Sequence, residues 1–502
     1  MKKNNKALLN VISNLTLQIC TIISGFIIPK IILVYFGSEV NGLVSSLNQM
    51  LNYIALVEGG VTGVITAALY KPLVENNTKS ISSIVNTANK FFKKIGFIFI
   101  IYSIILSIFY PLIFKTGFSF FYVFSLTIVL SMNLLIQYMF SLTYKTLLIA
   151  DKKIYIVSIS QSIMIILNIV LSIVSVKIYP SIHILKLING ILFLMQPIVF
   201  NYYINKNYSL NLEENANREL LKSRWDGFAI NVAAFIHSCT DVTILTIFSN
   251  LKMVSIYGVY SLVTNGVKSI INSISSAISP IIGHTYASGN QIELNKKLDL
   301  YEYIILFSVF TVFTITALLI TPFVMIYTKG INDANYYQPV FGYLIVMSEA
   351  LYLLKFPHLN LAYSANKFKE ITKPAFIEAL LNIIISIFLV KKYNIIGIMI
   401  GTIVAMLYRM IFHINYTKQI IRLRDCNKYY FKLLYFTFGA VAVFVVCNIF
   451  IDINIINVAS WIMAAFVYGM VAIVIYLIVS YLFFKEELLY LFRYIKKEKK
   501  LS

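Results

Sequence analysis

Long apolar runs separated by short polar stretches cover the whole chain. Each run holds about 20 residues or more, which is the length that an α-helix needs to cross the hydrocarbon of a bilayer. The sequence therefore predicts an all-α polytopic membrane protein with about fourteen transmembrane helices. The predicted bounds are 11–36, 41–69, 94–114, 119–144, 154–176, 181–204, 226–249, 254–283, 301–328, 337–363, 372–390, 395–416, 433–451 and 456–484.

One apolar pattern, marked by an asparagine and a serine, occurs twice. Residues 166–177 read ILNIVLSIVSVK and residues 380–391 read LLNIIISIFLVK, so seven of twelve positions are identical at an offset of 214 residues. The identical pairs are Leu167/Leu381, Asn168/Asn382, Ile169/Ile383, Ser172/Ser386, Ile173/Ile387, Val176/Val390 and Lys177/Lys391. The polar positions of each copy are spaced i, i+4 and so form one helix face, which is typical of hydrogen bonds between helices.

Neighbouring segments repeat at nearly the same offset. Ala150-Asp151-Lys152 corresponds to Ala365-Asn366-Lys367, and Gly42 corresponds to Gly258. The face with Ser45, Asn48, Gln49 and Asn52 matches the face with Ser261, Thr264, Asn265 and Lys268. The first twelve helices are therefore expected to form two six-helix repeats. Six is an even number, so the repeats are expected to be parallel, around a central cleft suited to alternating access.

This repeat gives the predicted domains. They are an N-terminal bundle over 1–204, a cytoplasmic connector over 205–225, a C-terminal bundle over 226–417, extra helices over 418–484 and a basic tail over 485–502.

The composition agrees with a membrane protein and explains the charge. Hydrophobic residues make up 59% of the 502 residues and charged ones 13%, whereas a soluble domain carries about 25% charge. With the N-terminus placed inside, 31 of the 42 lysines and arginines fall in cytoplasmic segments and seven in outer loops or helix ends. This positive-inside bias predicts cytoplasmic termini, and it assigns the net charge of +21 to topology and anionic lipid, not to nucleic acid.

Four basic residues remain inside the predicted spans, namely Lys186, Lys268, Lys355 and Arg409. A charge at the centre of a span costs about 2.5–3.5 kcal/mol, so it faces protein or a water-filled cavity. Lys268 lies on a polar face with Asn265 and Asn272, which suits an anionic ligand. The alternative is an ion pair with Glu58, Asp241, Glu349 or Glu378.

The predicted substrate-binding residues are Lys268, Arg409, Asn52, Asn265, Asn272 and Lys186. Arg409 either lines the mouth of the cleft or extends to the interface. Four of the acidic residues in spans, Glu58, Asp241, Glu378 and Glu349, are the candidates for ion coupling or gating. Glu378 is notable because its counterpart in the other repeat is Met164.

The sequence favours transport over catalysis. It holds no G-x-x-x-x-G-K-[ST] phosphate loop, no H-E-x-x-H motif and no cysteines with metal-ligand spacing. The predicted outer loops are too short for the active site of a polymerase. No enzymatic activity, cofactor or metal is expected.

The chain resembles the MOP (MATE-like) exporter superfamily, and within it the Wzx-type flippases of bacterial polysaccharide repeat units. The resemblance rests on Tyr35-Phe36-Gly37-Ser38-Glu39-Val40-Asn41-Gly42-Leu43, Val254-Ser255-Ile256-Tyr257-Gly258, Glu58-Gly59-Gly60, Asp241, and the segment from Ser279-Pro280 to Ser288-Gly289-Asn290. It covers essentially the whole chain.

This resemblance implies a function in the bacterial cytoplasmic (inner) membrane. The expected substrate is an undecaprenyl-pyrophosphate-linked oligosaccharide, moved to the outer leaflet for O-antigen, capsule or exopolysaccharide synthesis. Membrane lipids, H⁺ or Na⁺, and a polymerase with chain-length proteins are the implied partners. The alternatives are a MATE-type cation antiporter, a lipid II-type flippase, and a membrane scaffold of glycan synthesis that transports nothing.

Overall fold

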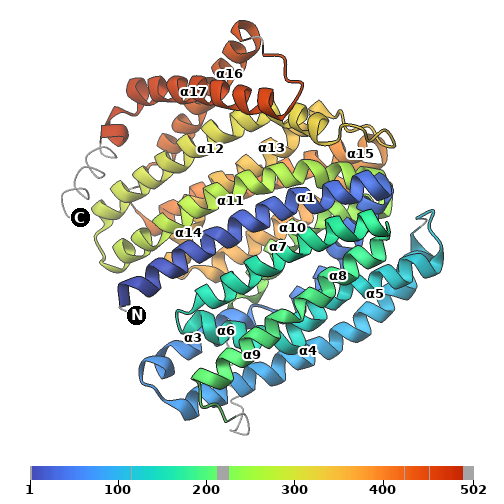
Figure 1. The fold of residues 1–502 in the computed structure, drawn as a ribbon. Helices are drawn as coiled ribbons and strands as arrows, with labels where there is room; N and C mark the ends of the chain where they lie inside the picture. Colours follow the sequence, from blue (N-terminus) through green and yellow to red (C-terminus); the bar gives the residue numbers. More distant parts are fainter. Residues whose placement is uncertain (1–2, 115, 212–224, 423, 452, 490–502) are drawn as a thin grey trace. The chain divides into compact units, whose positions relative to one another are not determined.

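The computed structural model describes residues 3–114, 116–211, 225–422, 424–451 and 453–489. Every secondary-structure element in these ranges is helical (Figure 1), so the predicted all-α class is confirmed. The chain forms two compact units, Met1–Ser255 and Ile256–Ser502, which are described separately.

The first unit is built on two pairs of adjacent helices. α1 (Lys3–Leu51) lies along α7 (Ile154–Ile178), and α4 (Thr78–Ile113) packs on α5 (Phe120–Ile136), as Figure 1 shows. The remaining elements are the 3₁₀-helix η1 (Asn52–Ile54), α2 (Ala55–Glu58), α3 (Val61–Val74), the π-helix η2 (Gln137–Ser141), α6 (Leu142–Ala150), α8 (Ile182–Phe193), α9 (Met195–Asn207) and α10 (Trp225–Phe248).

The second unit is organised around α12 (Gln291–Tyr327). This helix packs against α13 (Pro339–Leu354), α16 (Cys426–Phe450) and α17 (Val458–Phe483). The other elements are α11 (Leu251–Ala287), whose first residues belong to the first unit, α14 (Phe356–Ser364) and α15 (Phe368–Ile420).

Ten helical segments within the described ranges are long and apolar enough to cross a membrane, so the chain is a multi-pass membrane protein. Phe368–Ile420 contains two predicted spans, and Leu8–Glu58 contains the span 11–36 and the first part of the span 41–69. The breaks between those spans lie at Gly37 (φ 82°) and Asn394 (φ 48°). Each of the fourteen predicted segments coincides with a helix of the structure. The predicted span 41–69 is interrupted, because Gly59 and Gly60 both adopt left-handed conformations between α2 and α3.

Several helices begin before their predicted spans, and the largest differences are at α4 and α12. α4 begins at Thr78 where the sequence analysis placed the start at residue 94, and α12 begins at Gln291 where it placed the start at 301. The polar segments before these spans are amphipathic helix, not loop. Asn77 and Asn290 each cap a helix through the side chain, accepting from Ser80 N and Glu293 N. The first turns then bury apolar side chains such as Ile81 and Leu294.

The internal repeat is also seen in the backbone conformations of single residues. Lys152 and Asn366, 214 residues apart, have φ of 58° and 54°. The two turns also share their hydrogen bonds, since Lys153 N donates to Leu148 O and Lys367 N donates to Ala362 O at the same offset. The elements on either side match too, with α6 corresponding to α14 and α7 to the first part of α15. A shared left-handed residue is costly outside glycine, so its recurrence supports duplication of one unit.

The repeated asparagine and serine make a helix contact in the second unit. Asn382 donates to Thr402 Oγ1 (3.0 Å), and Ser386 donates to the carbonyl of Ile398 (3.4 Å). Gly401 allows this approach, because a Cβ there would clash with Ser386 Oγ. The structural interpretation of these residues as hydrogen bonds between helices is therefore confirmed for Asn382 and Ser386.

Candidate functional site

Four of the predicted site residues come together in the second unit. Lys268 of α11 pairs with Glu349 of α13, with Nζ 2.9 Å from Oε2. Arg409 of α15 pairs with Glu378 of the same helix, with Nη1 3.3 Å from Oε2. Lys355, between α13 and α14, is 3.9 Å from Glu378 Oε1. We call these five residues the Glu378 cluster.

An aromatic ring connects the two ion pairs of the cluster. Lys355 Nζ lies 4.3 Å from the centroid of the Tyr352 ring, and Lys268 Nζ lies 5.3 Å from it. Both distances are within the range in which a cation is attracted to the face of an aromatic ring. The ring therefore holds two cations close together without adding a negative charge.

The Glu378 cluster carries more positive than negative charge. Lys268, Lys355 and Arg409 face only Glu349 and Glu378 among the described charged side chains of the cluster. One positive charge is therefore left over. Because charges attract strongly where water is excluded, such an excess favours the approach of an anion.

The cluster has an inner and an outer part. The side chains of Lys355, Arg409 and Glu378 are between 5% and 8% exposed, whereas those of Lys268 and Glu349 are 24% and 18% exposed. Arg409 does not extend to an interface, which was one of its two predicted positions. Its Nε instead donates to His413 Nε2 at 2.7 Å, which fixes the guanidinium. A ligand can reach the cluster through Lys268 and Glu349.

A polar strip on α11 leads away from Lys268. Asn265 is exposed and Asn272 is partly exposed on the same helix face. A pocket of about 370 Å³ lies farther along this face. It is lined by Asn272, Ser275, Ser276, Ser279, Pro280, Phe356 and Asn360. Asn360 donates to Tyr301 Oη at 2.7 Å and to Ser275 Oγ at 3.1 Å, so hydroxyl and amide groups border the space. Such groups suit the hydroxyls of a sugar.

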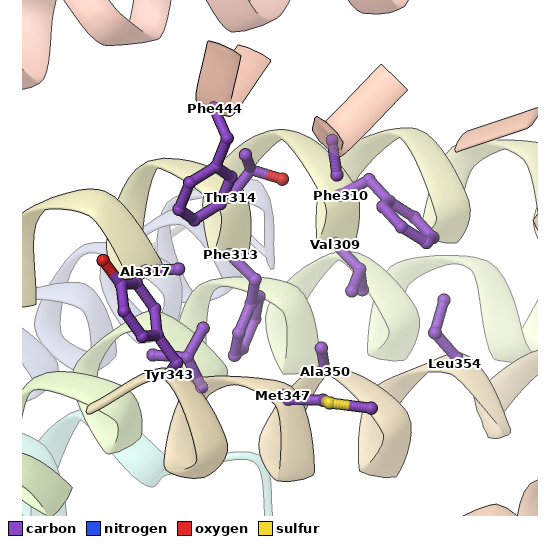
Figure 2. A pocket seen from close by; sticks show the side chains of 12 residues that line it. Val309, Phe310, Phe313, Thr314, Ala317, Tyr343, Met347, Ala350, Leu354 and Phe444 are labelled. Carbon is purple, nitrogen blue, oxygen red and sulfur yellow. The ribbon is translucent and has the colours of Figure 1, made fainter. Parts of the chain in front are cut away.

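An apolar pocket of about 580 Å³ opens on another side of α13 (Figure 2). Tyr343, Met347, Ala350 and Leu354 of α13 line it, together with residues of α12 and α16 such as Phe313 and Phe444. Ala350 directly follows Glu349 in the sequence, and Leu354 directly precedes Lys355. One helix therefore presents charged side chains on one side and an apolar cavity on another.

The other predicted residues lie in the first unit. Glu58 accepts hydrogen bonds from Thr62 and from Tyr138 Oη, the latter at 3.2 Å, at the break made by Gly59 and Gly60. Asn52 is exposed in η1, and Asp241 is buried in α10. Lys186 of α8 is partly buried in an apolar helix. Glu58 and Asp241 lie on elements that contact each other, α2 and α10.

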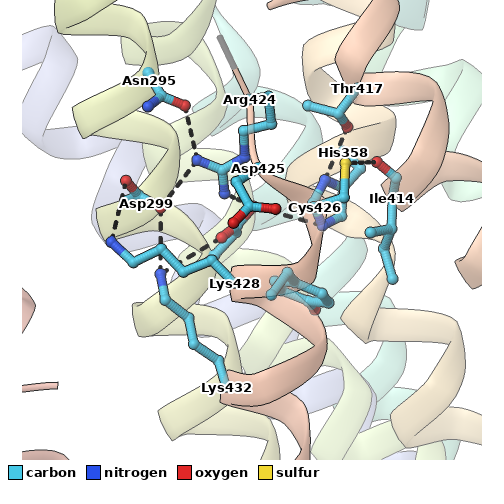
Figure 3. Close-up of polar contacts among 12 residues, drawn as sticks. Asn295, Asp299, His358, Ile414, Thr417, Arg424, Asp425, Cys426, Lys428 and Lys432 are labelled. Carbon is cyan, nitrogen blue, oxygen red and sulfur yellow. Dashed lines mark hydrogen bonds and ion pairs between the residues drawn. The ribbon is translucent and has the colours of Figure 1, made fainter. Parts of the chain in front are cut away.

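A second charged cluster was missed by the sequence analysis (Figure 3). Arg424, after α15, pairs with Glu302 and with Asp299 of α12, with Nη1 2.9 Å from Asp299 Oδ1. Lys432 of α16 lies 3.3 Å from Asp299 Oδ1 and 3.6 Å from Glu302 Oε2. Lys428 and Glu487 complete what we call the Glu302 cluster, in which Glu487 Oε1 lies 3.2 Å from Lys432 Nζ.

The charges of the Glu302 cluster balance, with three cations and three carboxylates. Burial alone would lower the pKa of Arg424, but the carboxylates of Glu302 and Asp299 outweigh it and raise the pKa. Burial would raise the pKa of Glu487, and Lys432 and Lys428 lower it instead. Both groups are thus held in their charged forms. The only sequence signal was the spacing of Asp299 with Glu302 and of Lys428 with Lys432, at the ends of apolar runs.

Comparison with known proteins supplies the fold family. No protein-family model matches the chain, and no curated protein matches it either. Among solved structures, the lipid II flippase MurJ in an inward closed conformation is similar, with a TM-score of 0.73 at 17% identity, over 95% of this chain and 99% of MurJ.

MATE transporters are also similar. An inward-facing multidrug resistance MATE family transporter of the MOP superfamily gives a TM-score of 0.56 at 13% identity, over 84% of this chain and all of that one. VcmN of Vibrio cholerae, a MATE transporter in the bent form, gives 0.56 at 12% identity, over 85% and 99%. The chain shares the fold of these solved flippase and transporter structures. The expected MATE-like fold is confirmed. These sequence identities are too low to assign the substrate of MurJ or of the MATE transporters to this chain.

Proposed function

We propose that the chain is a flippase that moves a lipid-linked oligosaccharide from the cytoplasmic to the outer leaflet of the bacterial inner membrane, with no enzymatic step. The excess positive charge of the Glu378 cluster carries the proposal, because a pyrophosphate is the anionic part of such a substrate. The polar strip and pocket along α11 provide partners for the sugars.

The lipid part of the substrate has a matching space. The apolar pocket bordered by α12, α13 and α16 lies next to the cluster along α13 and has the size of several isoprenoid units. The distribution of lysine and arginine supports cytoplasmic termini. The glycan is proposed to serve cell-surface polysaccharide synthesis, such as O-antigen, capsule or exopolysaccharide.

The likeness to MurJ favours one second candidate, a flippase for lipid II. Lipid II and polysaccharide repeat units share a polyprenyl pyrophosphate, so the Glu378 cluster suits both. A cation antiporter requires an acidic site, and the excess positive charge of this cluster opposes it.

The decisive experiment measures binding to the protein in nanodiscs by native mass spectrometry. Three ligands are offered, namely a polyprenyl-pyrophosphate oligosaccharide, lipid II and an organic cation. Wild type is expected to bind a glycolipid and not the cation. Lys268→Gln removes the excess charge and is expected to weaken binding about tenfold or more, which is about 1.4 kcal/mol. Glu349→Gln adds to the excess and is expected to retain or strengthen binding.

The matched control is Lys367→Gln, because Lys367 also belongs to an ion pair of the second unit but is exposed. It should bind as wild type does. Preference for lipid II over the oligosaccharide would select the second candidate. Binding of the cation alone would reject both flippase assignments.

A further inference from the structure

A buried histidine lies between the two charged clusters. His358 of α14 is 2% exposed and follows Lys355 of the Glu378 cluster by three residues. Its Nδ1 lies 3.0 Å from Thr417 Oγ1, a contact drawn in Figure 3, and its Nε2 lies 3.6 Å from Glu302 Oε1. Tyr429 holds the ring edge-on, with the centroids 4.7 Å apart. The imidazole therefore has one defined orientation.

The hydrogen bonds around Thr417 assign one of the ring protons. The Thr417 hydroxyl has a single proton, which it donates to the carbonyl of His413 at 3.0 Å. Toward His358 the hydroxyl can then only accept, so Nδ1 of His358 carries a proton. In a neutral imidazole, the remaining nitrogen is a bare lone pair. That nitrogen, Nε2, faces Glu302.

A lone pair facing a buried carboxylate is unfavourable. Glu302 is 0% exposed, and His358 Nε2 has no hydrogen-bond partner among the described residues. An unpaired polar atom in such a place costs about 1–3 kcal/mol, and a facing anion adds repulsion. One proton removes both penalties, either on Nε2 as an imidazolium beside a carboxylate or on Glu302 as a donor to Nε2.

We propose that His358 and Glu302 together form a proton-binding site that holds one proton between Nε2 and Oε1. The proton is the ligand of the site, and it titrates with the pair as a unit. A shift of a few tenths of an ångström closes the 3.6 Å separation to a hydrogen bond.

Titratable groups lie close to the pair and set its balance of charge. They are Asp299 of α12, His413 of α15, Arg424 of the following segment, and Tyr429 and Lys432 of α16. Arg424 and Lys432 disfavour the added positive charge, while Glu302 and Asp299 favour it. His413 stays neutral in this arrangement, because its Nε2 accepts from Arg409.

The site is connected to the Glu378 cluster through two helices. Lys355 and His358 lie on the same short segment, and Arg409, His413 and Thr417 follow one face of α15 at intervals of four residues. Loss of the proton would push His358 away from Glu302 and move both segments. If the proposed transport function holds, this links proton binding to the state of the substrate site.

Histidine-labelled protein in nanodiscs tests the site directly. The chain has five histidines, so ¹⁵N-histidine spectra are simple, and His358→Gln identifies one signal. Spectra are recorded between about pH 5 and about pH 8, where histidines normally change charge. We expect Nδ1 to stay protonated throughout. We also expect a proton at Nε2, or a carboxylic acid band in the infrared spectrum that Glu302→Gln abolishes.

The control is His183→Gln, because His183 contacts Ser125 in the first unit and has no part in the site. If His358→Gln does not fold, variants of the other four histidines assign its signal by elimination. A bare Nε2 over the whole pH range, with no acid band lost in Glu302→Gln, would overturn the proposal.

A transport assay tests the coupling. In proteoliposomes, the wild-type flipping rate should change severalfold per pH unit, and His358→Gln should remove this dependence while glycolipid binding remains. A wild-type rate that ignores pH would overturn the coupling and leave the flippase assignment intact. Absence of glycolipid binding by wild type would overturn the flippase assignment, while the nitrogen spectra would still decide the proton site.

Discussion

The second unit contains two buried charged clusters, and they differ in balance. The Glu302 cluster matches three cations to three carboxylates, and Arg424 and Lys432 have side chains at most 2% exposed. The Glu378 cluster has three cations for two carboxylates and is partly open at Lys268 and Glu349. A balanced cluster joins helices, whereas an unbalanced and accessible one leaves a charge for a ligand. The same residue types thus serve structure in one place and recognition in the other.

The largest expected effect concerns the balanced cluster. Arg424→Gln leaves Glu302 and Asp299 short of one buried cation, which should lower the free energy of unfolding by about 3–5 kcal/mol. Thermal unfolding of the purified protein, followed by size-exclusion chromatography, measures this. Lys428→Gln is the control, since Lys428 is half exposed in the same cluster and should cost at most about 1 kcal/mol. Equal losses in both variants would contradict the structural role of burial.

A substitution at an uncharged helix contact should have an intermediate effect on stability. Gly401→Ala places a Cβ against Ser386 Oγ and should destabilise the unit by about 1–3 kcal/mol through overpacking. Gly266→Ala on α11 meets nothing within 4 Å and should leave the unfolding temperature unchanged or raise it. A drop for Gly266→Ala as large as that for Gly401→Ala would show that close helix approach is not the cause.

The unbalanced cluster should matter less for stability than for binding. Lys268→Gln removes a partly exposed ion pair, so its cost in unfolding free energy should be about 1 kcal/mol or less. The same protein should bind glycolipid much more weakly than wild type. If its unfolding temperature falls as far as that of Arg424→Gln, the two clusters do not differ in the way proposed.

The smallest effect is expected at the surface. Lys71 and Glu75 form a pair at i, i+4 with side chains 85% and 51% exposed. Glu75→Gln should change the free energy of unfolding by about 0.3–0.5 kcal/mol, and high salt should abolish the difference. A larger effect would mean that the exposure of an ion pair is a poor guide to its contribution to the stability of this chain.

The sequence predicted the members of the Glu378 cluster better than their pairing. Charges inside apolar runs stand out because each needs a partner or water, so Lys268, Glu349, Glu378 and Arg409 were found. Four carboxylates were candidates for Lys268, and only helix packing selects Glu349. The position of Arg409 was left open between two alternatives for the same reason.

The Glu302 cluster was not predicted because its members lie near the ends of membrane helices, where charged residues are common. Lysine and arginine at the ends of membrane helices usually face headgroups, so Lys432 and Arg424 carried no signal of burial. The fold itself was predicted well from apolar run length and the repeat. The early start of α4 at Thr78 was missed because an amphipathic extension lacks the continuous apolar run used to define spans.

The Glu302 cluster imposes an order on the synthesis of the chain. Glu302 and its partner Arg424 are 122 residues apart, so α12 leaves the ribosome long before its counter-ion exists. Before Arg424 and Lys432 are synthesised, Glu302 lacks both cations that pair with it in the folded unit, so α12 is not yet fixed in its final position. Arrival of Arg424 and Lys432 then locks α12 and α16 in place. The chain between α12 and α16 is therefore inserted before the bundle is secured, and a nascent chain halted before Arg424 should be a substrate for membrane quality control.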